Sequence, residues 1–276
     1  MLSFDVEDWF QVERLRLSSA GQAWDNQELR VQANVERLLQ ILAGSGTLAT
    51  FFVLGWVAER VPGLVQSIVS RGHEVASHGY AHVLLNQLDE REFEEDLVKA
   101  KQLLEDGTGA EVVGYRAPRF STVEYLPEVL RRNGFLYDSS AFPSSVGIDY
   151  GNTNLVQAGE AGSVWRFSNG LVEAPISTLK LGGRNVPWGG GGYFRFYPYW
   201  IFRAGIRSVV RRRGWYLFYA HPWELDPAQP RVKDVPWLDR FLHYTLLGAT
   251  ERKLSRLIRD CHFVPIREGL TRLGLL

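Results

Sequence analysis

The chain has 276 residues, which is enough for one barrel-sized domain or two small ones, and a single domain is the simpler expectation. Thirty-one Lys and Arg balance thirty-one Asp and Glu, which removes the electrostatic case for nucleic acid or an anionic membrane as the main partner. The apolar fraction of 45% and the aromatic fraction of 13% exclude bulk disorder and would suit a carbohydrate-binding surface. Any charged binding site must therefore be local.

The N-terminal sequence does not read as an export signal. Met1 leads directly into Leu-Ser-Phe-Asp without a basic segment and an apolar core, and no run of eighteen apolar residues follows. We therefore expect a cytoplasmic protein without a transmembrane segment, with a peripheral position at the inner membrane as a variant of that expectation.

Apolar runs alternate with helical patterns through the first half of the chain. Short apolar runs predict strands at 2–5, 50–54, 73–77, 112–116 and 135–138. Apolar spacing and capping signals predict helices between them, around 35–42, 62–72, 89–105 and 123–132. This alternation of strands and helices predicts a parallel sheet.

The alternation of predicted strands and helices stops after residue 140. An irregular insertion is expected around 141–195, with a hairpin turn at Asn169-Gly170. Regular elements then return. Helices are predicted around 200–212 and 251–259, and strands at 215–220 and 262–266. The whole pattern predicts an α/β fold with a closed or nearly closed barrel, and a doubly wound open sheet is the alternative.

Carboxylates and histidines gather where predicted strands end. Asp5, Glu7 and Asp8 follow the first strand, and their mutual repulsion is costly unless a cation or an arginine compensates it. His78 and His82 follow the third strand; on one helical turn they would face the same side and could chelate one metal ion. Two imidazoles and a carboxylate suit zinc-assisted hydrolysis or non-haem iron chemistry. The alternatives are a solvated acidic loop and histidines that cap a helix or fill a polar pocket.

Two further strand ends carry ionisable residues. The segment 114–120 places Arg116 at the same edge, where it would pair with a carboxylate and fix its orientation, or form a surface salt bridge. The strand at 215–220 ends at His221, and histidine is the usual proton donor near neutral pH. Since the carboxyl ends of parallel strands meet at one edge, a catalytic role for His221 is favoured over a structural one.

With these residues in view, the chain resembles the polysaccharide deacetylases of carbohydrate esterase family 4, the NodB-homology group. Within that group it is most similar to the exopolysaccharide-locus branch associated with exosortase systems. The motifs that carry the resemblance are Ser3-Phe4-Asp5, Thr50-Phe51-Phe52-Val53 and the segment 73–82. The resemblance implies a distorted (β/α)7 barrel in a single domain, with a core of about 1–225 and a C-terminal helical segment and last strand at about 226–276.

The resemblance also implies roles for individual residues. Asp5 matches the catalytic base, His78 and His82 the metal-binding pair, Arg116 the residue that orients the base, and His221 the general acid. The first motif departs from the family pattern because Asp5 is followed by two further carboxylates. Glu7 is the metal ligand if strand alternation continues, and Asp8 is the ligand if the strand has already ended.

The implied cofactor is a divalent metal, with Zn²⁺ as the first choice and Co²⁺ or Ni²⁺ as alternatives. The implied reaction removes N-acetyl groups from N-acetylhexosamine units of a bacterial exopolysaccharide or its lipid-linked precursor, and a backbone N–H at 115–118 would hold the oxyanion. The residues expected to contact substrate are Tyr115, Arg119, Trp188 and Trp223. The glycine-rich loop 186–194 would supply a stacking wall, or else close the barrel with its aromatic residues in the core.

Two other functions remain in competition at this point. The first is a metal-dependent amidohydrolase that acts on a small cyclic amide. The second is a carbohydrate-binding protein whose catalytic site has decayed, and the intact set of candidate residues argues against it. No oligomeric state is predicted.

Overall fold

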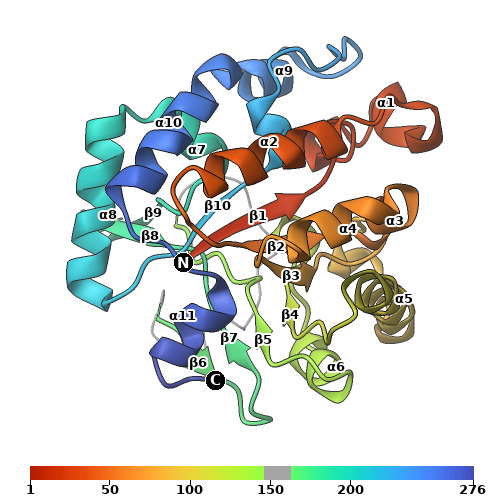
Figure 1. Cartoon of the computed structure of the whole chain (residues 1–276), viewed down its shortest axis with the longest axis horizontal. Coiled ribbons are helices and arrows are strands. Elements are labelled where there is room, and N and C mark those ends of the chain that lie inside the picture. The colour runs from red at the N-terminus through yellow and green to blue at the C-terminus, as the bar shows by residue number, and fades with distance from the viewer. Residues whose placement is uncertain (146–162) are drawn as a thin grey trace.

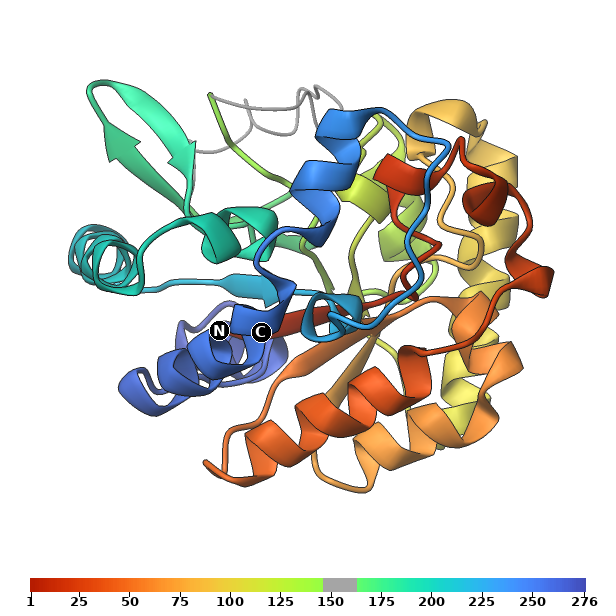
Figure 2. The ribbon, with the colours of Figure 1, turned by 90° about the horizontal axis from the view of Figure 1, so that it is seen from above.

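The computed structural model describes residues 1–145 and 163–276, which form helices packed around a curled eight-stranded sheet (Figures 1 and 2). The strand order is β10-β1-β2-β3-β4-β5-β7-β6. The strands of this sheet are β1 (Leu2–Val6), β2 (Thr50–Val53), β3 (Glu74–Ser77), β4 (Gly114–Tyr115), β5 (Tyr137–Asp138), β6 (Trp165–Arg166), β7 (Val172–Glu173) and β10 (Phe218–Ala220). A separate hairpin contains β8 (Thr178–Leu181) and β9 (Arg184–Pro187).

Seven strands of the sheet run parallel, and β6 joins the edge antiparallel to β7. The predicted α/β class and the barrel-like curvature are therefore confirmed, as a half-barrel rather than the doubly wound alternative. The register aligns the carboxyl ends of neighbouring strands, with Val6 beside Val53, Val53 beside Ser77, and Ser77 beside Tyr115. This alignment brings residues that are far apart in sequence to one edge of the sheet.

The helices cover the outer side of the sheet and its ends (Figure 1). They are α1 (Ser19–Gln22), α2 (Val31–Ala43), α3 (Gly55–Arg60), α4 (Pro62–Val69), α5 (Glu90–Thr108), α6 (Leu126–Arg132), α7 (Gly191–Phe196), α8 (Tyr199–Arg213), α9 (Trp237–Tyr244), α10 (Leu247–Asp260) and α11 (Ile266–Arg272). The predicted capping signals are present. Pro62 opens α4, and Asp89 and Glu92 form a reciprocal capping box at the start of α5, with hydrogen bonds of 2.8 and 2.9 Å.

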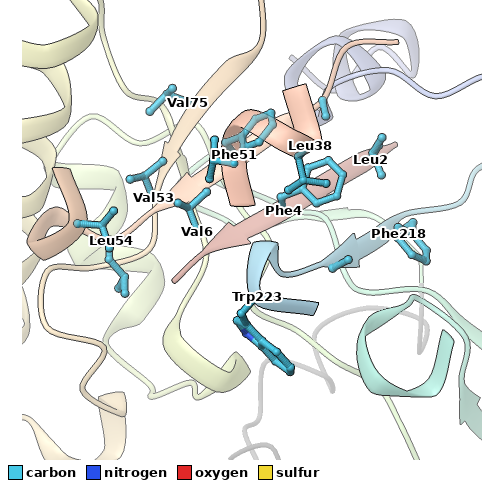
Figure 3. Close-up of a cluster of buried hydrophobic side chains, with 14 of the residues drawn as sticks. Leu2, Phe4, Val6, Leu38, Phe51, Val53, Leu54, Val75, Phe218 and Trp223 are labelled. Carbon is cyan, nitrogen blue, oxygen red and sulfur yellow. The ribbon is translucent and has the colours of Figure 1, made fainter. Parts of the chain in front are cut away.

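Alternation along β1 separates the core from the site. Leu2, Phe4 and Val6 belong to the main hydrophobic cluster together with Leu38 of α2 and Phe51 of β2 (Figure 3). Ser3 and Asp5, the intervening residues, point to the opposite face because successive side chains of a strand alternate. The first strand therefore supplies core packing on one face and ionisable chemistry on the other.

The hairpin predicted at Asn169-Gly170 is confirmed. The strands β6 and β7 pair antiparallel across this turn, and Gly170 adopts a φ of 88°. The Asn169 Oδ1 atom accepts a hydrogen bond of 3.1 Å from the Leu171 N–H, which stabilises the turn. The part of the expected insertion at 146–162 lies outside the described residues.

Two predictions about regular secondary structure were wrong. The strand predicted at 262–266 is absent from the described sheet: Leu2 N–H donates to the Val264 carbonyl at 3.0 Å, and Pro265, which has no N–H, precedes α11. The region expected to be an irregular insertion contains β8, β9 and α7 after residue 177. The glycine-rich loop therefore begins in a strand and ends in a helix.

None of the helices in the two described ranges combines the length and the apolar character needed to cross a membrane.

Gly114 in β4 lies close to the side chain of Tyr137, so a substitution at this position tests how closely the sheet is packed there. A Cβ atom at this position would lie 2.2 Å from the Tyr137 hydroxyl, which itself donates to Glu74 Oε1 at 2.8 Å. We expect Gly114→Ala to lower the free energy of unfolding by about 1–3 kcal/mol in urea denaturation. Gly63→Ala in α4, where no atom lies within 4 Å of the added carbon, is the control and should be neutral or slightly stabilising. A Gly114 variant as stable as this control would contradict the close packing.

Candidate active site

A cavity of about 550 Å³ opens at the carboxyl edge of the sheet. Five ionisable residues predicted from strand ends line it: Asp5, Glu7, His78, His82 and His221. Its outer wall comes from the 3-10 helix Glu13–Leu15 and from α7 and α9. The edge predicted from the sequence to carry the chemistry is thus the edge at which the cavity lies.

A buried ion pair anchors the cavity floor. Arg116, which has no solvent exposure, donates from Nη1 to Asp5 Oδ1 at 2.5 Å. The remaining guanidinium donors reach the Ser3 hydroxyl, the Ser139 hydroxyl and the Ser139 carbonyl, at 2.9, 2.8 and 3.2 Å. Because every contact is to a fixed polar group, Arg116 holds the Asp5 carboxylate in one orientation and leaves Oδ2 toward the cavity.

Glu7 lies between two histidines. Its Oε2 atom is 3.2 Å from His82 Nε2, and its Oε1 atom is 3.2 Å from His221 Nε2. Burial raises the pKa of Glu7 to about 7, although the neighbouring His221 opposes the shift. Glu7 therefore gains and loses its proton near neutral pH even with His221 beside it.

His78 and His82 come together, but not on a helical turn as the spacing had suggested. They lie in an irregular segment after β3, in which Gly79 has a φ of 75° and His82 a φ of 52°, and their ring centroids are 5.4 Å apart. Asp96 of α5 holds this segment by accepting from the Tyr80 and Ala81 N–H groups at 2.8 and 3.2 Å. Asp96, which is sixteen and fifteen residues beyond these two donors, thus positions the loop.

Both imidazoles are neutral. Burial lowers the pKa of His78 to about 4 and lowers that of His82 well below its usual value. His78 Nδ1 lies 2.7 Å from the Arg116 carbonyl oxygen, which can only accept, so Nδ1 carries the proton and Nε2 keeps its lone pair. Such a hydrogen bond is the usual way in which a protein orients a metal-binding histidine.

His221 is paired with a residue to which the sequence analysis gave no role. Its Nδ1 atom lies 2.8 Å from Glu224 Oε1, and Glu224 in turn contacts Arg195 Nε at 2.9 Å. Burial alone would lower the pKa of His221, but Glu224, Glu7 and Asp5 together raise it to about 9. The i, i+3 spacing after Pro222 resembles a helix capping box and could have identified Glu224, whereas no local signal points to Arg195.

Asp8 faces away from the cavity. Its Oδ2 atom accepts from the Arg30 and Val31 N–H groups at 2.7 and 2.9 Å, and its Oδ1 atom accepts from the Trp9 N–H at 2.8 Å. These bonds satisfy the N-terminal end of α2. Of the two carboxylates left open by the sequence, Glu7 is the one that faces the imidazoles.

The residues expected to contact substrate divide into two pairs. Arg119 and Trp223 line the cavity, and the Trp223 ring stacks on His221 with a centroid distance of 5.3 Å. The assignments of Tyr115 and Trp188 were wrong because both side chains are packed in the core. Tyr115 packs against Phe93 and Phe135, while Trp188 stacks on Phe202 and donates from Nε1 to its carbonyl.

The backbone N–H groups expected to hold the oxyanion are already engaged. The Arg116 N–H donates to the Ser77 carbonyl at 2.9 Å, the Ala117 N–H donates to the Ser140 hydroxyl at 2.8 Å, and Pro118 has no N–H. These three positions therefore provide no free backbone donor.

The donor types around Glu7 suit a divalent cation. Two neutral imidazoles are present, and the buried Glu7 Oε2 atom lies 3.2 Å from His82 Nε2 without the geometry of a hydrogen bond. As the side chains stand, the described ranges contain no group of three or more His, Cys, Asp or Glu side chains that could hold a metal ion. Glu7, His78 and His82 are thus candidate ligands by their chemistry. Metal-binding measurements test whether they bind one ion together.

Comparisons with known proteins found similar sequences and similar structures. Residues 18–137 match the model of the family "Polysaccharide deacetylase", and residues 139–271 match "Domain of unknown function (DUF3473)". The chain is 39% identical over 111 residues to the peptidoglycan deacetylase-like protein FGM2 of Gibberella zeae, and 33% identical over 109 residues to a peptidoglycan deacetylase of Helicobacter pylori. Each match covers 40% of this chain, which spans about a third of the length of these curated relatives (33% and 37%).

Solved structures share the fold. A probable polysaccharide deacetylase from Pseudomonas aeruginosa PAO1 aligns with a TM-score of 0.59 and 16% identity, covering 99% of this chain and 89% of that one. A family 4 carbohydrate esterase pseudoenzyme from Bacillus anthracis aligns with a TM-score of 0.52 and 13% identity, covering 97% and 63%. These structures show a shared fold, and the sequence match over residues 18–137 shows that this part of the chain is similar to polysaccharide deacetylases.

Matched amide substitutions distinguish the two carboxylates. Glu7→Gln should weaken Zn²⁺ binding by more than about tenfold in calorimetric titration because it removes a negative oxygen donor beside the imidazoles. Asp8→Asn should leave Zn²⁺ binding intact but lower the free energy of unfolding by about 1–3 kcal/mol, since it disturbs three buried hydrogen bonds at α2. Loss of Zn²⁺ binding in Asp8→Asn with retention in Glu7→Gln would reverse the assignment.

Proposed function

We propose that the protein is a metal-dependent deacetylase that removes N-acetyl groups from N-acetylhexosamine units of a bacterial polysaccharide. The observation that carries the proposal is the arrangement of Asp5 and His221 at the cavity floor. Asp5 Oδ2 lies 4.0 Å from His221 Nε2, and each residue is fixed from behind, by Arg116 and Glu224 respectively. A base and an acid that line the same small cavity are what hydrolysis of an amide requires.

The candidate metal ligands are His78, His82 and Glu7. When bound, a divalent ion such as Zn²⁺ would supply Lewis-acid polarisation of the amide carbonyl and would lower the pKa of a water molecule. The protein's part is to present two neutral imidazoles and one carboxylate at the cavity floor. Zn²⁺ is proposed first because imidazole nitrogen and carboxylate oxygen are its usual ligands, and Co²⁺ and Ni²⁺ remain alternatives.

Asp5 would act as the base. Its Oδ1 atom is held by Arg116, so Oδ2 would accept the proton of the attacking water. His221 would act as the acid because its raised pKa keeps it protonated at neutral pH, and it would donate to the departing amine nitrogen. The products would be acetate and a free amino sugar.

The substrate class is proposed from the cavity and the family. The cavity has room for a sugar residue, Arg119 lies at its wall, and the relatives named above are described as peptidoglycan deacetylases. We place the protein in the exopolysaccharide branch associated with exosortase systems on the strength of its first motif, with a polymer or a lipid-linked precursor as substrate. Acetate release measured on a panel of N-acetylated glycans tests this choice.

Asp5→Asn should remove the base while keeping the side-chain size and an oxygen for Arg116. We expect the variant to fold, to keep its bound metal, and to lose about 10²–10⁴-fold in the rate of acetate release from N-acetylglucosamine oligomers. Asp226→Asn, which alters an ion pair with Arg30 outside the cavity, is the control and should keep normal activity. Near-normal turnover in Asp5→Asn would move the role of the base to another residue.

His221→Ala should be rescued in part by an activated acetate ester. The alcohol of such an ester needs less protonation on departure than an amine does, so the defect should be much smaller on the ester than on the amide. Glu224→Gln should show the same pattern in milder form, because it retains His221 but removes its charged partner. Equal defects of His221→Ala on amide and ester would show that His221 has a structural role instead.

A further inference from the structure

Helix α9 exposes large apolar side chains to solvent. Trp237, Leu238 and Phe241 are 74%, 50% and 51% exposed, and their positions i, i+1 and i+4 lie on one face of the helix. The opposite side of α9 is held to the protein, since His243 is fully buried and Asp239 pairs with Arg14 at 3.2 Å. The exposed face is therefore presented by an anchored helix and not by a loose end.

The exposed face continues toward the candidate active site. Phe196 of α7 stacks on Phe241 with a centroid distance of 6.1 Å, and it also lines the cavity. Leu17, which is 76% exposed, also lines the cavity, and two residues further along the chain the Ser19 N–H donates to Asp234, which precedes α9. We call these apolar residues the α9 rim: Leu17, Phe196, Trp237, Leu238 and Phe241.

Basic side chains surround the rim. Arg231, Lys233 and Arg240 are exposed, and within the described ranges none of them forms an ion pair. Of the neighbouring carboxylates, Asp239 pairs with Arg14, whereas Asp234 accepts a hydrogen bond of 2.7 Å from the Ser19 N–H and keeps its negative charge. Apart from the Asp239–Arg14 pair, three cations therefore stand against one carboxylate, and positive charge is in excess beside the rim.

We propose that the α9 rim docks the mouth of the cavity onto an anionic lipid surface. Trp, Phe and Leu on one face of a helix, flanked by Arg and Lys, is the composition of helices that lie in a membrane interface. The apolar side chains would enter the headgroup region, and Arg231, Lys233 and Arg240 would contact lipid phosphates. Because the rim is continuous with the cavity wall, docking would face the cavity toward glycans held at that surface.

Two other occupants fit the observations less well. A glycan strand could stack on the aromatic rings of Phe196, Trp237 and Phe241, but it would leave the exposed aliphatic side chains of Leu17 and Leu238 without an apolar partner. A second copy of the chain, docked through the same face, would bring the excess positive charge of both copies into one interface. An anionic lipid surface satisfies both the apolar and the basic side chains.

Co-sedimentation with vesicles tests the proposal without any measurement of turnover. The full chain should sediment with phosphatidylglycerol vesicles, bind pure phosphatidylcholine vesicles weakly, and be released by high salt. The triple variant Trp237→Ser/Leu238→Ser/Phe241→Ser should lose binding by at least about tenfold. The matched control Leu29→Ser/Leu48→Ser/Val98→Ser removes exposed apolar side chains from the segments that flank α2 and from α5, and it should bind normally.

A second variant covers the case in which the serine variant unfolds. Arg231→Gln/Lys233→Gln/Arg240→Gln leaves the apolar face intact and should also lose binding to phosphatidylglycerol, with a weaker salt dependence. Equal binding by the control and the α9 variants, or no binding by the unmodified chain, would overturn the proposal. A concentration-dependent dimer lost in the serine variant without vesicle binding would equally overturn it. Normal acetate release from soluble oligomers together with absent vesicle binding would reject the docking surface alone and leave the proposed function standing.

Discussion

The buried ion pair between Arg116 and Asp5 is the interaction on which the rest of the site depends. A guanidinium without solvent contact is costly unless its donors are satisfied, and here they reach Asp5, Ser3 and Ser139. These contacts tie β1, β4 and the end of β5 to one point at the carboxyl edge. The same carboxylate that compensates the buried charge is therefore the one that faces the cavity.

The second constraint is the balance of charge around this pair. Asp5, Glu7 and Glu224 are buried carboxylates, and Arg116 and Arg195 are their buried guanidinium partners. Three carboxylates stand against two guanidinium groups, which leaves one negative charge in excess. This excess explains why the pKa of His221, which contacts these carboxylates, is raised rather than lowered. The three neighbouring carboxylates together raise the pKa of His221 and so favour its protonated form. The decayed-site alternative is disfavoured, because the proposed acid, His221, and the proposed base, Asp5, both retain their supporting residues.

Much of this arrangement follows from the sequence because its signals are local. Apolar runs, capping residues and the Asn-Gly turn depend on neighbours along the chain, and the parallel sheet then brings Asp5, His78 and His221 together. Other features depend on contacts between distant segments. Arg195 reaches Glu224 only through the packing of α7, and the glycine-rich segment gives no sign that Trp188 turns into the core. The role of Asp8 could not be predicted for the same reason, since its hydrogen-bond partners at the start of α2 lie more than twenty residues further along the chain.

The most direct test of the account is to measure bound metal and acetate release on the same preparation. The protein would be treated with a chelator, dialysed and reloaded with Zn²⁺, with metal determined by mass spectrometry and acetate released from N-acetylglucosamine oligomers determined at each stage. The account predicts about one equivalent of metal per chain, since one set of two imidazoles and a carboxylate makes one site. Metal and activity should be lost together and regained together. Full activity in metal-free protein, or one bound Zn²⁺ without acetate release from any N-acetylated glycan, would contradict it.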